Sequence, residues 1–521
     1  MKMPSRSKAK LSFIIVLFVL NFSAFSQVTN IEWQKCFGGS WSDWAAEGEQ
    51  TQDGGYIVAG VAESLDGDAL GNHGGTDFLI LKLDSWGNIV WQKCLGGSGY
   101  DYSTSIEQTS DGGFVVGGIA SSIDGDVDGN HDPTGYEPDC WIIKLDSAGN
   151  IEWKKCLGGS SWDGAYSIEQ VADGGYIVAA AAASDNGDVT GSHGECDCWI
   201  VKLDNAGEIE WQKTYGGTKL DYASSVHESK KGGYIFIGSG RSEDGDFTGH
   251  LGSNNDDNLW VIRLDSAGNI LWKKNLGVTD YNDSYTIMET VDAGYIVTGQ
   301  SISLVKLDSI GDIQWKKIFD VQDICDVQDA RQTSDGGYIV VGDSWRQIID
   351  WPPSGDGDFW IGKTDNYGNL EWQDTLGGSG TEYAYGSLSI KETLDGGFLL
   401  AGETMSNDED VSGNHGDWDV WVVKLSAPNG INEAGVIKNS IEIYPNPFSS
   451  LTTITLSLGE NAFATIELFD LTGRKFKTLL DENVAAGDHK LYLNGDQLSS
   501  GLYFLQLKMN GEVVTKKIII E

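Results

Sequence analysis

The sequence predicts an all-β protein with a seven-bladed β-propeller, closed by its N-terminal strand, followed by a small β-sandwich. Three observations predict this fold. Glycine is abundant, with 69 residues against 8 prolines, and aromatic residues make up 11% of the chain, which is typical of short strands joined by tight turns. A tryptophan string recurs seven times along the chain. A string built on two glycines recurs in step with the first, with Gly-Gly in six copies and Ala293-Gly294 in the remaining one.

The repeats define the propeller. A string of the form I-x-W-x-K, with L-E-W-Q as its last copy, places its tryptophans at Trp33, Trp91, Trp153, Trp211, Trp272, Trp315 and Trp372. Between these copies lie D-G-G-[YF], as at Gly54-Gly55, and W-I-x-K-L-D, whose last copy is residues 421–425. Each unit is expected to form four strands, which in the second unit are residues 102–109, 113–120, 140–146 and 150–157.

The apolar pattern of the strands favours blades over other all-β folds. The middle strands of each unit are apolar on both faces, whereas the tryptophan strand alternates. In a propeller, each sheet packs against a neighbour on either side. Its middle strands are then buried on both faces, and its outer strand is buried on one face. A β-sandwich or a solenoid is the alternative.

The ends of the repeat region predict how the ring closes. Residues 31–36 form a tryptophan strand before any complete unit, and the seventh unit lacks one after residues 421–425. Pairing between these two segments would complete the last blade and cover both sheet edges.

The first 26 residues resemble a signal peptide. Lys2, Arg6, Lys8 and Lys10 precede an apolar stretch at residues 11–20, and Ala24-Phe25-Ser26 offers small residues before a cleavage site at Gln27. The predicted organisation is a signal peptide (1–26), the propeller (27–425), a linker (426–438) and a C-terminal domain (439–521). No transmembrane segment is expected after cleavage.

Charge limits the partners. Lys and Arg number 35 and Asp and Glu 77, which gives a net charge of −42 and argues against nucleic acid or anionic lipid as a partner. The seven cysteines are an odd number, so at least one has no partner within the chain. We interpret them as structural.

The C-terminal segment has short alternating strands, which predict a small Ig-like β-sandwich. It closely resembles the type A C-terminal sorting domain of type IX secretion substrates. The motifs that carry the resemblance are Tyr444-Pro445-Asn446-Pro447, the Leu468–Arg474 segment with Gly473, Gly501-Leu502-Tyr503, and Lys516-Lys517. The resemblance implies contact with the type IX secretion machinery, export through the periplasm and outer membrane, and release or display at the cell surface.

Repeated acidic loops and histidines are the first candidate sites. Asp124, Asp126 and Asp128 fit the start of a calcium loop, although the glutamate expected at its twelfth position is Gly135, so calcium is a possible cofactor and no other is expected. The alternative is that these side chains shape the loop through backbone hydrogen bonds. His73, His131, His193 and His415 share one repeated position, which favours a structural role. Acidic residues that open the first strands either ring the channel mouth around a cation or begin strands: Asp43, Asp101, Asp163, Asp221 and Glu382.

Aromatic residues outside the strand pattern are candidate ligand contacts. They lie in connections assigned to one face, as Trp41, Trp44, Trp162, Trp345, Trp351 and Trp418. Trp345, Arg346 and Trp351 belong to the sixth unit, which departs most from the repeat. Aromatic rings beside acidic side chains suit sugars or protein partners, and the alternative is that these residues pack the loops.

The sequence contains none of the common hydrolase or phosphate-binding motifs. Similar blades favour a secreted or surface propeller that binds an extracellular glycan or protein over a single catalytic centre. The alternatives are a polysaccharide hydrolase or lyase that uses carboxylates at the channel mouth, and a structural or adhesion protein. Ligand identity, disulfide pairing and the final location of the exported protein stay open.

Overall fold

The computed structural model describes residues 30–252, 256–279, 286–299, 304–319, 324–344, 357–382, 388–427, 440–444, 448, 451–458, 462–470, 474–484, 487–494, 498, 501–509 and 512–520. The chain divides into two compact units, residues 1–430 and 431–521, and each is described by itself. The predicted signal peptide lies outside the described residues.

The described part of the first unit contains seven antiparallel four-stranded sheets. The first strand of each sheet is, in order, β2 (Asp43–Gln50), β6 (Asp101–Gln108), β10 (Asp163–Gln170), β14 (Asp221–Glu228), β18 (Ile287–Glu289), β22 (Ile324–Gln332) and β26 (Ser389–Glu392). The second strands are β3 (Tyr56–Ala62), β7 (Phe114–Ala120), β11 (Tyr176–Ala182), β15 (Tyr234–Gly240), β19 (Tyr295–Val297), β23 (Tyr338–Ser344) and β27 (Phe398–Thr404).

The third strands are β4 (Asp77–Leu83), β8 (Asp139–Leu145), β12 (Asp197–Leu203), β16 (Asp257–Leu264), β20 (Leu304–Leu307), β24 (Asp358–Thr364) and β28 (Asp419–Leu425). The outer strands of sheets 1 to 6 are β5 (Ile89–Leu95), β9 (Ile151–Leu157), β13 (Ile209–Tyr215), β17 (Ile270–Thr279), β21 (Ile313–Lys317) and β25 (Leu370–Leu376). The outer strand of sheet 7 is β1 (Ile31–Phe37), which pairs with β28 so that Cys36 faces Trp421. A 3-10 turn, η1 (Gly245–Phe247), lies in the connection between β15 and β16 of sheet 4.

The observed strands follow the sequence pattern closely. The second sheet has its strands at Asp101–Gln108, Phe114–Ala120, Asp139–Leu145 and Ile151–Leu157, within one residue of the prediction. Every residue of β3 and β8 is buried, whereas the outer strand β9 is buried only at its end. This confirms the predicted all-β fold of repeated four-stranded sheets.

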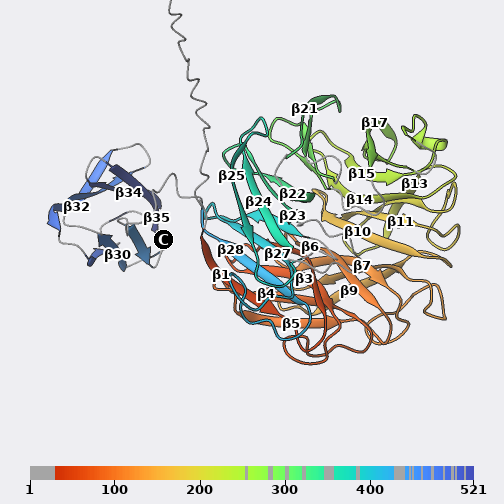
Figure 1. Ribbon diagram of the computed structural model, residues 1–521, viewed down its shortest axis with the longest axis horizontal. Coiled ribbons are helices and arrows are strands. Elements are labelled where there is room, and N and C mark those ends of the chain that lie inside the picture. The colour runs from red at the N-terminus through yellow and green to blue at the C-terminus, as the bar shows by residue number, and fades with distance from the viewer. Residues whose placement is uncertain are drawn as a thin grey trace, which may run out of the picture. The chain divides into compact units, whose positions relative to one another are not determined.

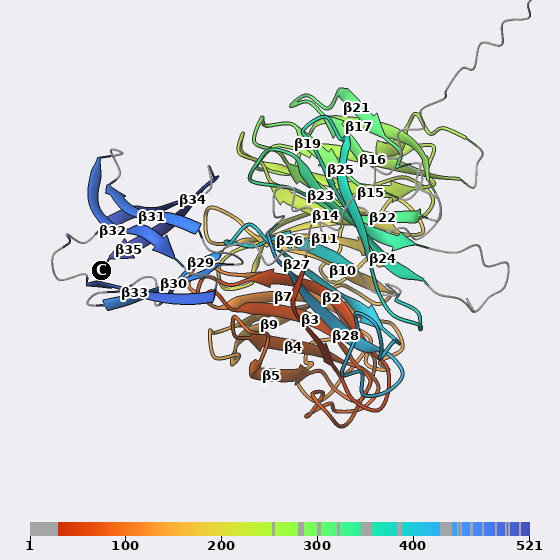
Figure 2. The same cartoon turned by 60° about the vertical axis from the view of Figure 1, so that its left-hand side comes forward.

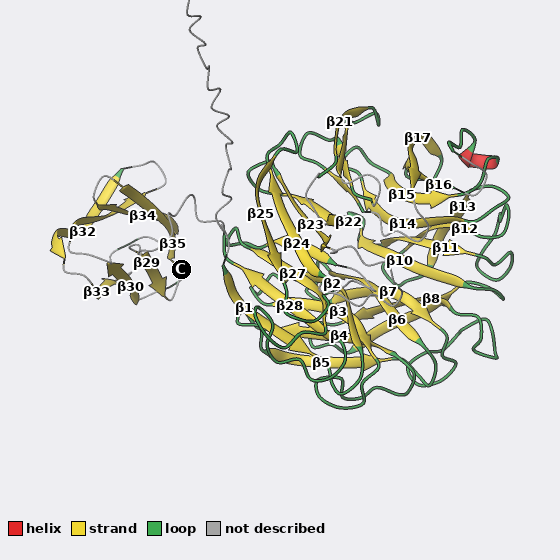
Figure 3. Cartoon of the chain, in the orientation of Figure 1, coloured by secondary structure: helices red, strands yellow, loops and turns green. Residues whose placement is uncertain are grey.

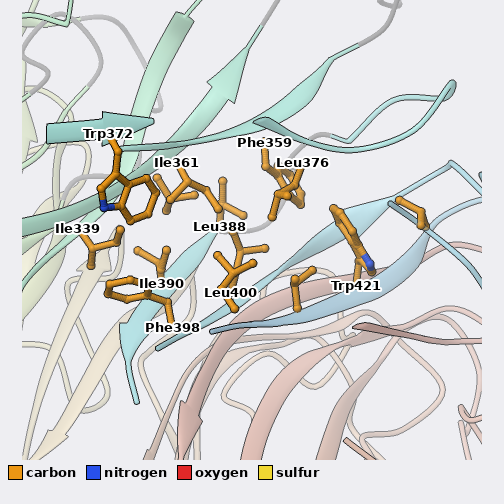
Figure 4. Packing of buried hydrophobic residues seen from close by; sticks show 14 of the residues in the cluster. Ile339, Phe359, Ile361, Trp372, Leu376, Leu388, Ile390, Phe398, Leu400 and Trp421 are labelled. Carbon is orange, nitrogen blue, oxygen red and sulfur yellow. The ribbon is translucent and has the colours of Figure 1, made fainter. Parts of the chain in front are cut away.

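Aromatic pairs join each sheet to the next. The tryptophan of one outer strand packs against the aromatic residue that follows the glycine pair of the next sheet, with ring centroids 5.3–6.2 Å apart. The seven pairs are Trp91–Phe114, Trp153–Tyr176, Trp211–Tyr234, Trp272–Tyr295, Trp315–Tyr338, Trp372–Phe398 and Trp33–Tyr56. The last pair connects sheet 7 to sheet 1. Figure 4 shows the apolar cluster between sheets 6 and 7, where Phe359 and Trp421 meet.

Hydrogen bonds repeat the same cyclic order. In each sheet, the first strand is followed by a tight turn. The backbone N–H of the second residue after that strand donates to a Gln or Glu side chain on the first strand of the next sheet, at 2.6–2.9 Å. The donors and acceptors are Gln52–Gln108, Ser110–Gln170, Ala172–Glu228, Lys230–Glu289, Val291–Gln332, Ser334–Glu392 and Leu394–Gln50. The bond from Leu394 to Gln50 returns from sheet 7 to sheet 1.

The first strands lie at the middle of this unit. Figure 1 shows β6, β10, β14 and β22 near its centre and β1, β5, β17, β21 and β25 toward its edge. In the turned view of Figure 2, β27 and β28 of sheet 7 lie beside β2 and β3 of sheet 1. Figure 3 shows strands and loops throughout the drawn fold, with η1 as its one helical turn among the described residues. No helix within these residues is long and apolar enough to span a bilayer.

The cysteines are packed inside the repeat sheets. The six with described side chains are free and buried, and Cys36, Cys94 and Cys156 occupy the same position on three outer strands. Burial raises the pKa of the Cys36 and Cys94 thiols to about 12, so these groups stay protonated. Their placement agrees with a structural role.

The second unit consists of two antiparallel sheets. One has the order β29 (Ser440–Tyr444), β30 (Leu451–Leu458), β33 (Gly487–Asn494), and the other has the order β32 (Lys475–Val484), β31 (Ala462–Asp470), β34 (Gly501–Met509), β35 (Glu512–Ile520). A core that includes Ile454, Ile466 and Leu505 lies between them. The sequence pattern predicted the other strands but not β32, because β32 is an exposed edge strand rich in charge and lacks a clear apolar face.

Candidate functional site

A cavity of about 850 Å³ lies among the first strands of the repeat unit. Its described walls come from β2, β6, β10, β14, β22 and β26, which contribute successive layers of side chains along their length. A volume of this size is typical of small-molecule sites, which bury most of a ligand's surface. The cavity is therefore the candidate site of this protein.

Aromatic side chains form one layer of the cavity wall. Trp44, Tyr102 and Tyr222 each follow the aspartate that begins a first strand, and Tyr166 lines the cavity from β10. Sheet 3 has a glycine at the equivalent position, and Trp162 stands next to that space, with its ring centroid 6.4 Å from Tyr166 and 6.5 Å from Tyr222. Sheets 1 to 4 thus each contribute an aromatic side chain to the cavity wall, and together with Trp162 these residues are called the aromatic arc.

A band of hydroxyl groups lies further along the same strands. Ser105, Ser167, Ser225 and Ser389 occupy equivalent register positions, where sheets 1 and 6 have Glu47 and Asp329 instead. The Ser105 hydroxyl donates to Glu47 Oε2 at 3.0 Å. Hydroxyls both donate and accept, so this layer suits a ligand with many hydroxyl groups of its own.

Charged residues form the next layer. The equivalent positions on sheets 1 to 3 are Glu49, Glu107 and Glu169, whereas sheets 4, 6 and 7 have His227, Arg331 and Lys391. The layer therefore has an acidic arc and a basic arc. Sequence analysis missed it, although a signal was present: these columns vary from repeat to repeat while their neighbours on the same strands stay constant.

Glu47 links the two arcs. Lys391 Nζ lies 2.7 Å from Glu47 Oε1 and 3.3 Å from Glu49 Oε2, and Arg331 Nη2 lies 3.9 Å from Glu47 Oε1. Burial alone would raise the pKa of Glu47, but Lys391 and Arg331 outweigh it and lower that pKa to about 2. Glu47 is thus a carboxylate at any physiological pH.

Glu107 has the opposite character. Burial raises its pKa to about 8, and the nearby Glu169 and Glu49 add to this effect, although the Gln170 N–H donates to Glu107 Oε2 at 2.6 Å. At neutral pH the Glu107 carboxyl is mainly protonated and has a proton to donate. Glu47 and Glu107 are therefore two carboxyl groups in one cavity with their pKa values pushed apart.

The residues predicted as ligand contacts are distributed in three ways. Trp44 lines the cavity, and Trp162 packs against its tyrosines. Trp41 is 60% exposed in the connection from β1 to β2, and the Trp418 carbonyl accepts a hydrogen bond from the Asp43 N–H. Trp345, Arg346 and Trp351 lie outside the described residues. Tyr102, Tyr166 and Tyr222 were not predicted from the sequence to be ligand contacts.

The predicted calcium loop makes local hydrogen bonds. Asp124 Oδ1 accepts from the Ser98 N–H at 2.7 Å, and Asp128 lies 3.4 Å from Lys154 Nζ. The Asp126 N–H donates to the Gly96 carbonyl. Among the described residues, no group of three or more His, Cys, Asp or Glu side chains is arranged to hold a metal. Asp126 Oδ2 accepts from the Gly96 N–H at 3.5 Å, so the three carboxylates have different local partners. Calcium binding by this loop stays a prediction from the sequence.

Buried carboxylates occur in pairs where one sheet meets the next. A β-carbon on Gly96 would lie 2.3 Å from Asp77 Oδ1 and 2.7 Å from Asp101 Oδ2, so both carboxylates face one glycine. Both are fully buried, as are the members of the equivalent pairs Asp419–Asp43, Asp139–Asp163 and Asp197–Asp221. None of these residues lines the cavity described above.

Hydrogen bonds hold these carboxylates in place. Asp43 accepts from the Gly39 and Ser64 backbones and from the Ser64 hydroxyl, at 2.7–3.1 Å. On the other side of the glycine, His415 Nδ1 lies 2.7 Å from Asp419 Oδ2, and His73 and His131 contact Asp77 and Asp139 in the same way. The repetition agrees with a structural role for these histidines.

The paired carboxylates predict a pH-dependent stability. Burial raises the pKa of Asp43, Asp77 and Asp163 from 3.8 to about 6 and that of Asp221 to about 7. The folded protein then binds more protons than the unfolded chain in this range, so stability is fully present below the unfolded pKa and is lost as the pH rises through the folded pKa. We expect the melting temperature to fall between about pH 4 and about pH 7, that is, from the unfolded pKa to the highest folded pKa of the set.

Thermal unfolding at constant ionic strength measures this fall. In the Asp221→Asn variant, which lacks the group with the highest pKa of the set, the decline above about pH 6 should be shallower. A melting temperature that stays constant or rises across this range would contradict the assignment.

The comparisons with known proteins fall in two parts of the chain. Residues 442–521 match the family model of the secretion system C-terminal sorting domain, which confirms the predicted type IX sorting domain. In this segment Tyr503 is buried and packs edge-on to Phe476, and Lys516 is exposed on β35. Pro445, Asn446, Pro447 and Gly473 lie outside the described residues.

One curated relative is the regulatory protein FlaEY of Caulobacter vibrioides, with 24% identity over 181 residues. The match covers 32% of this chain and only 18% of that protein.

Several solved structures match the repeat region. They include BBS1N in complex with ARL6DN (12% identity, 78% of this chain and 98% of that chain, TM-score 0.43), YCF48 bound to D1 peptide (7%, 76% and 97%, 0.40) and puromycin hydrolase (11%, 81% and 60%, 0.44). Identities this low leave the function of this chain open.

The chain is thus an all-β protein of repeated four-stranded sheets with a type IX sorting domain at its C-terminal end. The sorting domain indicates export to the cell surface or secretion.

Proposed function

We propose that residues 27–425 form a closed seven-bladed β-propeller that binds an extracellular ligand, a glycan or a protein, in its central cavity. In this proposal residues 1–26 are a signal peptide, residues 426–438 are a linker and residues 439–521 direct export. The cyclic order of the aromatic pairs and of the backbone hydrogen bonds supports a closed ring. Trp345, Arg346 and Trp351 stay predictions from the sequence.

The observation that carries the function is the cavity's departure from sevenfold repetition. Positions that only hold sheets together repeat in every sheet, as the tryptophan and glycine strings do. The cavity instead has aromatic rings on one side and an acidic and a basic arc in a single layer. Such asymmetry at the centre of a repeated fold is expected where the protein recognises one ligand.

The test measures retention of the purified protein on immobilised extracellular polysaccharides and proteins, together with the release of new chain ends. We expect retention without cleavage, and we expect Trp44→Ala combined with Tyr102→Ala to abolish it. Trp86→Ala is the matched control, since Trp86 is 74% exposed on a turn between β4 and β5. Retention that survives the double substitution would exclude the cavity, and new chain ends would favour an enzyme.

A further inference from the structure

We propose that the cavity selects an uncharged saccharide and discriminates against acidic ones. This inference rests on the proposed function and names the class of its ligand. It follows from three features of the described wall: the aromatic arc, the hydroxyl band, and the way in which every basic group there is already paired with a carboxylate.

The aromatic arc suits the flat faces of sugar rings. Trp44, Tyr102 and Tyr222 lie on neighbouring sheets with Trp162 among them, so successive rings of a short saccharide would meet successive side chains. The C–H face of a pyranose carries a partial positive charge that packs well on an aromatic face. Tyrosine adds a hydroxyl group that hydrogen-bonds the sugar's edge.

The hydroxyl band supplies partners for sugar hydroxyls. Among the described residues, nine serines and threonines line the cavity, including the equivalent Ser105, Ser167, Ser225 and Ser389. Several of these hydroxyls already donate within the protein, as Ser105 does to Glu47 and Ser103 to the Gly60 carbonyl. Each hydroxyl oxygen keeps lone pairs that can accept a hydrogen bond from a sugar hydroxyl.

The basic groups are not available to an anion. Among the described residues of the wall, Lys391 contacts Glu47 and Glu49, and Arg331 contacts Glu47 and Asp329. His227 Nδ1 contacts Glu169. A uronate, sulfate or phosphate would have to displace a carboxylate that is itself partly buried, which leaves that carboxylate without its partner.

The acidic groups repel anions directly. Glu47, Glu49, Glu169 and Asp329 outnumber the basic groups of the described wall, so the field inside is negative, as it is for the whole chain with its net charge of −42. Glu107, held protonated by its surroundings at neutral pH, is a donor for a sugar oxygen. The hydroxyl groups of a neutral saccharide would find carboxylate acceptors and the Glu107 donor in the cavity. An acidic saccharide would be repelled by the same carboxylates.

The test compares affinities by calorimetry for the purified full-length protein. The neutral probes are cello-, xylo- and mannohexaose, and the acidic probes are oligogalacturonate and oligomannuronate of the same length. We expect at least one neutral probe to bind at least about tenfold more tightly than any acidic one at pH 7. Trp44→Ala should lower the affinity for that probe by about tenfold, and Trp86→Ala should leave this affinity unchanged.

Each outcome decides the inference. Tighter binding of an acidic probe would overturn it, and if Trp44→Ala weakened that binding too, the proposed cavity function would stand. If no saccharide bound, but an immobilised protein retained the native chain and not the Trp44 and Tyr102 variants, the saccharide inference would be overturned and the proposed cavity function would stand. Neutral binding unaffected by Trp44→Ala would overturn both. The Glu107→Gln variant keeps a hydrogen-bond donor but has no titratable proton, so it should bind the neutral probe equally at pH 7 and pH 9. The native protein should bind that probe more weakly at pH 9 than at pH 7.

Discussion

Deletion of β1 (Ile31–Phe37) is expected to abolish the cooperative unfolding of the repeat unit. β1 is the outer strand of sheet 7, and it covers Trp421, which is fully buried and donates from Nε1 to Gln34 Oε1 at 2.9 Å. It also supplies Trp33, whose ring packs 5.3 Å from Tyr56 of sheet 1. Its loss therefore removes one strand, exposes a core and weakens the contact between the last sheet and the first, which share an apolar cluster.

The size of the effect follows from Trp33 alone. Trp33→Ala should lower the free energy of unfolding by about 3 kcal/mol, because a large aromatic side chain leaves a cavity between two sheets. A whole strand contributes several such contacts, which together exceed the roughly 5–15 kcal/mol by which typical proteins are stable. Denaturation followed by tryptophan fluorescence measures both variants.

Two controls separate this effect from general damage. Trp86→Ala removes an exposed tryptophan and should change stability by less than about 0.5 kcal/mol. A synthetic peptide of residues 30–38, added in excess, should restore a cooperative transition to the deletion variant, since it replaces the missing strand. A deletion variant that melts at the temperature of the intact protein would contradict the role of β1.

The Lys391→Met substitution is expected to destabilise the protein by about 3 kcal/mol at neutral pH. It removes the closest cation from Glu47, 2.7 Å away, and from Glu49, and it leaves two partly buried carboxylates with weaker compensation. Without Lys391 the pKa of Glu47 rises from its value of about 2, so the folded protein gains affinity for protons. The deficit should therefore shrink as the pH falls below about 5.

Equilibrium unfolding at two pH values measures this difference. Adding Glu47→Gln to Lys391→Met should recover part of the lost stability, because it removes the unpaired charge. Lys219→Met is the matched control: its partner Glu243 is 3.0 Å away but the pair is exposed, so the loss should stay below about 0.5 kcal/mol. An equal effect from both lysines would show that the cavity pair does not contribute as proposed.

Much of the repeat fold was predictable because its contacts repeat. The partner of Trp91 is the aromatic residue after the next glycine pair, and the same relation holds in all seven copies, so the sequence displays it seven times. Strand ends were predicted within one residue in the second sheet since Asp-Gly-Gly and Asp-x-x-Gly turns mark them. The edge strand β32 lacked such a signal.

The cavity could not be predicted in the same way. Glu47 and Lys391 are separated by 344 positions and meet only when the last sheet returns to the first. Neither belongs to a repeated string, and each alone resembles an ordinary polar residue on a strand. A search for repeated strings does not find such residues, because they differ between copies. Their signal is that the residue type varies at a strand position whose neighbours stay similar from copy to copy.

The meeting of sheet 7 with β1 has a consequence for the order of folding. The Ser426 N–H donates to the Asn30 carbonyl at 2.8 Å. The first strand of the unit therefore begins beside the end of the last strand, although 396 positions of the chain separate these two residues. In a chain made from its N-terminus, β1 has no partner until β28 has followed it. Until then, the free strand and the uncovered edge of sheet 7 have to be kept from pairing with other chains.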